Sequence, residues 1–124
     1  MKSLLLILAM FRGEAAEAGV ILPDSITIEY ALLGTDTLGV ATKSGNVWTV
    51  KISLLVEPDL IETVVYHELG HVCGLDHCKG RSIMNYGYMV PLTPAIKKRF
   101  LSQIVQFQKL CNEQKQDYTA ERVR

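Results

Sequence analysis

Three histidines in the middle of the chain have the spacing of metal ligands. His67 and His71 are four residues apart, so on a helix their imidazoles project from one face and can reach the same ion. Gly74 can turn the chain after that helix, which lets His77 return as a third nitrogen ligand. Three ligands leave the fourth tetrahedral position for water, which is the arrangement of a catalytic zinc site.

Glu68 would supply the acid–base chemistry at such a site. Zinc lowers the pKa of a bound water to about 7 and polarises a carbonyl. Glu68 is next to His67 in the sequence, and its carboxylate could take a proton from the water and pass it to a leaving amine. The expected reaction is therefore peptide-bond hydrolysis, with one catalytic Zn²⁺ as the cofactor.

The length of the pattern argues against coincidence. A bare HExxH recurs by chance on surface helices, but here a glycine and a third histidine also stand at fixed positions. All three histidines of the 124-residue chain lie inside this stretch. The residues alone therefore predict a zinc site.

The stretch HELGHVCGLDH, from His67 to His77, resembles the HExxHxxGxxH motif of the metzincin clan of zinc metallopeptidases. Ser82 to Tyr86 is similar to the Met-turn of that clan. The resemblance implies that Met84 forms an apolar floor beneath the zinc. It also implies that Tyr86 contacts the zinc or the tetrahedral intermediate, as a tyrosine does in astacins and serralysins. Matrixins place other residues there, so Tyr86 is alternatively a packing tyrosine.

Cys78 follows the third histidine, and in this the chain resembles archaemetzincins. Those proteins carry a second zinc on four cysteines, but this chain has Arg81 and Ser82 where the next cysteine would be expected. Cys78 could instead pair with Cys73 or Cys111, or remain a free thiol. Three cysteines allow at most one disulfide.

The segment before the motif has the pattern of a small sheet. Alternating apolar and polar residues predict strands at 26–30, 38–42 and 47–56, and the turn at 43–46 joins the last two as a hairpin. One face of the third strand is expected to point into the core: Trp48, Val50, Ile52 and Leu54.

The first strand of this hairpin is where the resemblance implies that substrate binds. In metzincins such a hairpin precedes the active-site helix, and its first strand is an exposed edge that pairs with extended substrate. Residues 38–42 would be that edge, because an unpaired strand can take up a peptide as an added strand. A protein or peptide is therefore the expected partner. Alternatively, the edge is merely short to avoid aggregation.

Two helices are expected to carry and support the site. Asp59 and Glu62 form a capping-box-like pattern, which predicts that the site helix begins there and runs to about Cys73. Thr93 and Pro94 are typical of the cap and first residue of a second long helix. Its buried stripe is expected to comprise Ile96, Phe100, Leu101, Ile104, Phe107 and Leu110.

The predicted fold class is α+β: a compact minimal metzincin-like domain over 19–124, with a small twisted mixed sheet, the active-site helix, the Met-turn and a C-terminal helix. Residues 1–18 have two interpretations. Their basic start, apolar run and small residues Ala16 and Ala18 favour a signal peptide and a secreted or periplasmic protein. The helical spacing of Leu4, Leu8 and Phe11 favours a backing helix that remains on a cytoplasmic protein.

Composition limits the partners. Thirteen basic and thirteen acidic residues cancel, so there is no electrostatic case for nucleic acid. The initial apolar run is too short for a stable membrane span. The leading hypothesis is a zinc-dependent endopeptidase. The alternative is a zinc-stabilised, catalytically silent binding module of the same fold, against which the presence of Glu68 speaks.

Overall fold

The alternating apolar segments form a three-stranded mixed sheet. The structure is a computed structural model that describes residues 3–78, 80–85, 87 and 89–122. Strand β1 spans Ser25–Ala31, β2 spans Gly39–Ser44 and β3 spans Val47–Ser53. β3 lies in the middle, where it pairs parallel with β1 and antiparallel with β2. The hairpin of β2 and β3 is confirmed, and β2 is an edge strand, as expected.

The core face of β3 agrees with the predicted pattern except at its end. Val50 and Ile52 are fully buried and Trp48 is half-buried. Leu54 is 43% exposed, so the prediction that it faces the core is wrong. The reason is that β3 ends at Ser53, whose hydroxyl accepts a hydrogen bond from the Leu55 N–H and turns the chain.

Helix α2, Ile61–Val72, carries the central histidines and starts differently from the prediction. A 3-10 turn, η1, at Pro58–Leu60 leads directly into α2, and no side chain caps the first turn of the helix. The capping box predicted from Asp59 and Glu62 is therefore wrong. Pro58 favours the tight turn because its ring fixes φ near the helical value.

The end of α2 is set by Gly74, as predicted. Gly74 has φ +105°, which a residue with a side chain rarely adopts. Its N–H donates to the carbonyl of His71, and the N–H of Leu75 donates to the carbonyl of Gly70. This is the Schellman pattern, which satisfies the last carbonyls of a helix and reverses the chain. The reversal brings His77 back toward α2.

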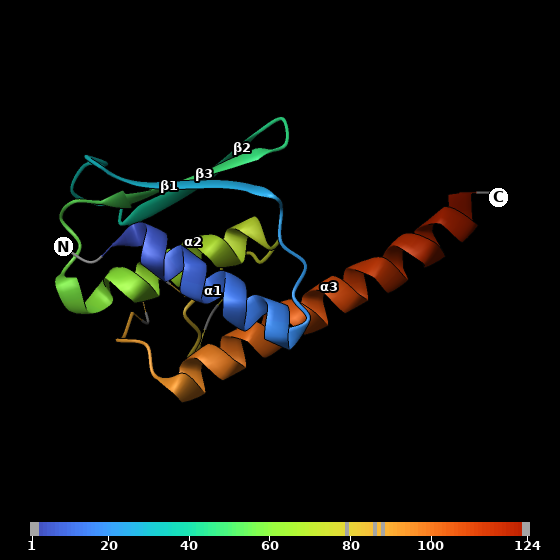
Figure 1. Cartoon of the computed structure of the whole chain (residues 1–124). Helices are drawn as coiled ribbons and strands as arrows, with labels where there is room; N and C mark the ends of the chain where they lie inside the picture. The colour runs from blue at the N-terminus through green and yellow to red at the C-terminus, as the bar shows by residue number, and fades with distance from the viewer. Residues whose placement is uncertain (1–2, 79, 86, 88, 123–124) are drawn as a thin grey trace.

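Helix α1, Leu4–Ala18, and helix α3, Pro94–Arg122, complete the fold. α1 packs against β1, α2 and α3, while α2 packs against β2 and β3 (Figure 1). Figure 1 shows the sheet on one side of α2 and α3 on the other. Five residues of α1 belong to the core: Leu4, Ile7, Leu8, Phe11 and Ala15. α1 is thus a packed helix of the described structure.

The start of α3 matches the predicted cap. The hydroxyl of Thr93 accepts a hydrogen bond of 3.2 Å from the Ile96 N–H, and Pro94 is the first helical residue. Phe100 and Ile104 are buried, but Leu110 is 56% exposed because this part of α3 extends past the core. The prediction that Leu110 is buried is wrong. None of the described helices has both the length and the apolar character that a bilayer span requires.

Candidate metal centre

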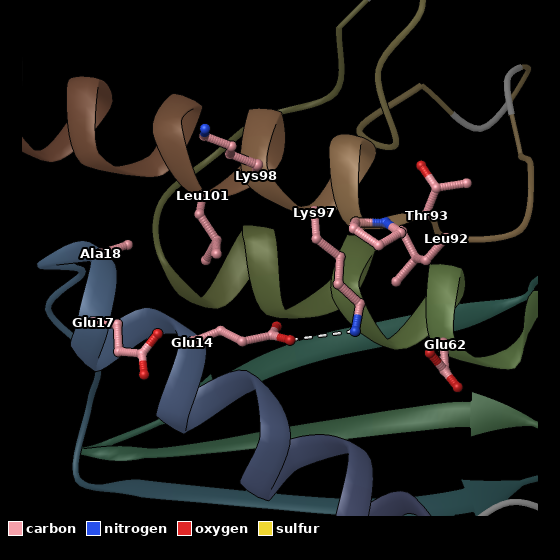
Figure 2. A pocket seen from close by; sticks show the side chains of 10 residues that line it. Glu14, Glu17, Ala18, Glu62, Leu92, Thr93, Lys97, Lys98 and Leu101 are labelled. Carbon is pink, nitrogen blue, oxygen red and sulfur yellow. Dashed lines mark hydrogen bonds and ion pairs between the residues drawn. The ribbon is translucent and has the colours of Figure 1, made fainter.

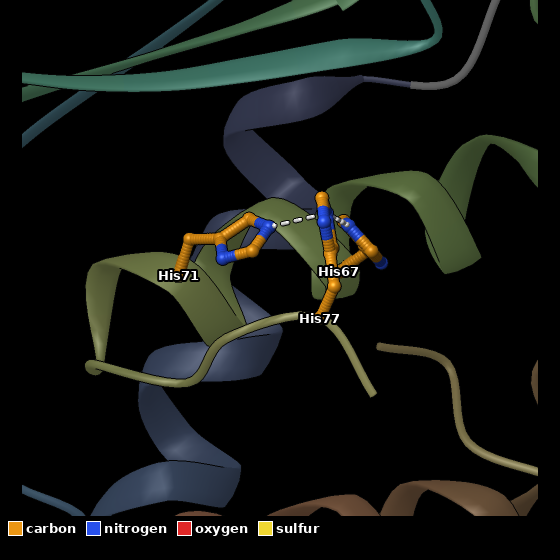
Figure 3. A group of neighbouring side chains, drawn as sticks. All are labelled: His67, His71 and His77. Carbon is orange, nitrogen blue, oxygen red and sulfur yellow. Dashed lines mark hydrogen bonds between the residues drawn. The ribbon is translucent and has the colours of Figure 1, made fainter. Parts of the chain in front are cut away.

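The rings of His67, His71 and His77 meet at one point beside α2 (Figure 3). The Nε2 atom of His77 lies 3.1 Å from Nε2 of His71 and 3.2 Å from Nε2 of His67. Two nitrogens that bind one metal tetrahedrally at about 2.1 Å are about 3.4 Å apart. The three side chains are therefore close enough together to hold one metal ion.

Two backbone carbonyls fix the orientation of the helical histidines. The Nδ1–H of His67 donates to the carbonyl of Ile83, and the Nδ1–H of His71 donates to the carbonyl of Leu75 over 2.7 Å. A carbonyl only accepts, so Nδ1 is the donor in both rings, and Nε2 of each ring is the nitrogen that faces the other histidines. The Nε2 atoms of both rings lie within hydrogen-bond distance of Nε2 of His77, so the three atoms face the same point.

Burial keeps His67 in the form that binds metal. Removal of the ring from water lowers the pKa of His67 to about 4, because the charged imidazolium loses its hydration. His67 is thus neutral at physiological pH, as a nitrogen ligand must be. His71 is half-buried and His77 is exposed, so the site opens to solvent on the side of the loop that carries His77.

Glu68 lies beside the three histidines and is not one of the metal-binding group. Its side chain is almost fully buried, at 1% exposure, and its Oε2 is 4.0 Å from Nε2 of His67. The residue faces β2, since Gly39 at the start of that strand is in close contact with Glu68. The carboxylate thus lies between the edge strand and the ligand nitrogens, where it could exchange a proton with a water at the metal.

The segment that resembles a Met-turn contacts both α2 and the loop that carries His77. Met84 is buried, and a Cβ atom added to Gly70 would lie only 2.6 Å from its Sδ, so the thioether packs on the backbone between His67 and His71. The carbonyl of Met84 accepts a hydrogen bond from the N–H of Cys78, which is the neighbour of His77. The segment therefore holds the loop ligand as well as the helix.

Tyr86, the other predicted catalytic residue, lies outside the described residues, and its role stays a prediction. All three cysteines are free thiols, so neither of the disulfides considered for Cys78 is present. Cys73 is buried, and that burial raises the pKa of its thiol to about 12. Cys78 is exposed.

Several contacts of the site could not be recognised in the sequence. The carbonyls of Ile83 and Leu75 belong to backbone groups that carry no residue signature. Gly39 and Gly70 have side-chain neighbours that only the fold brings together. A glycine inside the site helix and another at the start of a strand were the available signals, because glycine in such places often marks a close approach.

A pocket of about 500 Å³ lies apart from the histidines, between α1 and the beginning of α3 (Figure 2). Glu14 and Lys97 form an ion pair of 3.3 Å in its wall. None of the predicted site residues lines this pocket. It therefore belongs to the packing of the helices around α2 and not to the metal centre.

The chain matches no protein-family model, no curated protein sequence and no solved structure.

Proposed function

We propose that this protein is a zinc-dependent endopeptidase that uses Glu68 as its general base. The observation that carries the proposal is the convergence of three histidine Nε2 atoms beside a buried carboxylate, with Oε2 of Glu68 4.0 Å from Nε2 of His67. Three nitrogen ligands with one open position are typical of catalytic zinc, whereas structural zinc sites are closed by four protein ligands. The motif that resembles metzincins supports the same reaction.

Each residue of the candidate site has its own role in the proposed hydrolysis. When bound by His67, His71 and His77, zinc would polarise the scissile carbonyl and lower the pKa of water. Glu68 accepts the proton of the attacking water and returns it to the nitrogen of the leaving group. Its burial next to β2 keeps the carboxylate in one place for both transfers. Tyr86 is proposed to contact the tetrahedral intermediate, on the strength of the resemblance alone.

The backbone of β2 supports an extended peptide as the substrate. The carbonyl of Leu38 accepts a hydrogen bond of 2.8 Å from the N–H of Ser53, and residues of an antiparallel pair alternate between bonded and non-bonded positions. Val40 and Thr42 therefore also bond to β3. Gly39 and Ala41 direct their N–H and C=O groups away from β3, across the edge of the sheet.

A peptide that pairs with these groups would pass beside the metal centre. Gly39 is the residue of the edge strand that contacts Glu68, so the substrate residue opposite it lies nearest the general base. Affinity would come from main-chain hydrogen bonds, which any sequence can make. Binding of this kind requires neither terminus of the substrate, which supports cleavage within chains.

The test compares the zinc-loaded wild type with Glu68→Gln, a variant of equal shape that cannot act as a base. Both are incubated with a mixed peptide library, and the products are identified by mass spectrometry. The proposal predicts internal cuts by the wild type, their loss on removal of zinc, and a rate in Glu68→Gln that is lower by about 100-fold or more at equal zinc content. Zinc in both proteins without cleavage by either would instead favour the silent binding module.

A further inference from the structure

We infer that Gly39 is a positioning residue for Glu68: the absence of a side chain at the start of β2 leaves the space in which the Glu68 carboxylate lies. The inference rests on the proposed role of Glu68, and its structural part can be tested separately. Gly39 contributes no side-chain group to the reaction, whereas its backbone groups are proposed to pair with the substrate. It acts through the carboxylate that it contacts.

The distances around Gly39 show how little room there is. A Cβ atom added to Gly39 would lie 2.9 Å from Cγ and 3.0 Å from Oε2 of Glu68. It would also lie 3.1 Å from Cγ1 of Val64, one turn earlier on α2. Cβ atoms in proteins essentially never have neighbours closer than 3.0 Å, so any side chain at position 39 requires a shift.

The backbone conformation gives no other reason for a glycine there. Gly39 is not among the glycines with positive φ, which are found in turns at other positions of the chain. An alanine could therefore adopt the same φ and ψ angles, and only the neighbouring atoms exclude it. Space, and not backbone freedom, is the property that Gly39 provides.

The atoms around Gly39 differ in how easily they can move. The start of β2 is held to β3 by the hydrogen bond between Leu38 and Ser53, and Gly39 lies opposite the fully buried Ile52. Val64 is also fully buried. The Glu68 side chain has three rotatable bonds, so its carboxylate is the group that a new methyl would displace first.

Displacement of the carboxylate should lower the rate of the reaction more than it disturbs the fold. A general base must lie within hydrogen-bond distance of the proton that it takes, and an error of about 1 Å can cost about 100-fold in rate. The three atoms nearest the added methyl belong to Glu68 and Val64, and none of them is a histidine nitrogen. The Gly39→Ala variant should therefore bind zinc as the wild type does and lose turnover.

The experiment uses the full zinc-loaded chain and three single variants. Gly39→Ala introduces the methyl group, Val64→Ala removes the other neighbour of that position, and Gly13→Ala is a control at a site with no atom within 4 Å of the new Cβ. Crystal structures give the distance from Glu68 Oε2 to His67 Nε2, which is 4.0 Å in the wild type. Zinc content and kcat are measured on the same samples.

The inference predicts that Gly39→Ala binds one zinc, has a carboxylate displaced by a few tenths of an ångström or more and loses at least about tenfold in kcat. Val64→Ala and Gly13→Ala should keep kcat within about twofold. If Val64→Ala lowers kcat as much as Gly39→Ala does, loosened packing of β2 on α2 explains the loss, and the inference is wrong. A Gly39→Ala structure with the carboxylate in its wild-type place also overturns it, whatever the activity.

A second variant covers the case in which Gly39→Ala does not fold. In Gly39→Ala/Val64→Ala the contact with Cγ1 of Val64 is removed, while the contacts with Glu68 remain. The carboxylate should still be displaced, and an unmoved carboxylate would count against the inference. Failure of the proposed function can be distinguished from failure of this inference. If the wild type cleaves no peptide, the proposed function is wrong, but crystal structures still show whether Gly39→Ala displaces the carboxylate.

Discussion

The phenol of Tyr66 donates a hydrogen bond to the carboxylate of Glu14 and so joins α2, which carries two of the three histidines, to α1. Lys97 of α3 completes this contact, since its ammonium lies 3.3 Å from Oε2 of Glu14 and 5.3 Å from the centre of the Tyr66 ring. Burial and the neighbouring carboxylate raise the pKa of Tyr66, so the phenol remains a donor. Three helices thus meet at one polar cluster, which consists of Glu14, Tyr66 and Lys97.

The Glu14 cluster should contribute measurably to stability. Replacement of Glu14 by alanine leaves the Tyr66 hydroxyl and the Lys97 ammonium without this partner, and should lower the free energy of unfolding by about 1–3 kcal/mol. Glu17→Ala, at an exposed position of the same helix, should change it by less than about 0.5 kcal/mol. Urea unfolding of the two variants makes the comparison. Equal losses would mean that the cluster contributes nothing specific.

Helix α1 should be needed for folding of the rest of the chain. A protein that begins at Gly19 lacks the five core residues of α1, among them Phe11, which packs on the ring of Tyr66 at a centroid distance of 5.2 Å. It should unfold at a much lower temperature than the full chain, or fail to fold. Thermal unfolding followed by circular dichroism is the measurement. A shortened chain that melts like the full one and binds zinc would favour the signal-peptide interpretation.

A side chain at position 70 should destabilise the protein. A Cβ atom there would lie 2.6 Å from Sδ of Met84 and 3.1 Å from the ring of Phe100, so Gly70→Ala should cost about 1–3 kcal/mol through overpacking. Gly13→Ala, in an open helical position, should be neutral or stabilising by up to about 1 kcal/mol. The midpoints of chemical denaturation give both values. Equal behaviour of the two variants would show that Met84 does not pack against α2.

Cys78 and Cys73 should react at different rates with a thiol reagent. Cys78 is exposed and should be labelled first in the folded protein, while Cys73 is buried and should react only when the chain unfolds. Mass spectrometry of peptides from protein labelled with and without urea identifies the sites. Rapid labelling of Cys73 in the native protein would contradict the packing of the end of α2.

The sheet and the helix ends were predictable where short-range patterns determine them. Alternation located β1 and the hairpin of β2 and β3, and Gly74 and Thr93 marked helix ends because their local chemistry is largely independent of the rest of the fold. The start of α2 was predicted wrongly because the 3-10 turn at Pro58 competed with a plausible cap.

The spacing of the histidines predicted that they lie close enough together to hold a metal ion. The contacts that position the site residues could not be predicted from the sequence. Glu68 and Gly39 are 29 positions apart, and only the packing of α2 on β2 makes them neighbours. The carbonyl that orients His67 comes from Ile83, for which no side-chain pattern exists. Contacts of this kind depend on tertiary packing, which periodicity does not encode.

The most direct test of the metal centre is a zinc titration of the metal-free chain, followed by X-ray absorption at the zinc edge. The account predicts one zinc per chain, a shell of three imidazole nitrogens and one oxygen, and loss of tight binding in His67→Ala, His71→Ala and His77→Ala. Absence of bound zinc, or a sulfur ligand in its shell, would contradict the catalytic centre proposed for these three histidines.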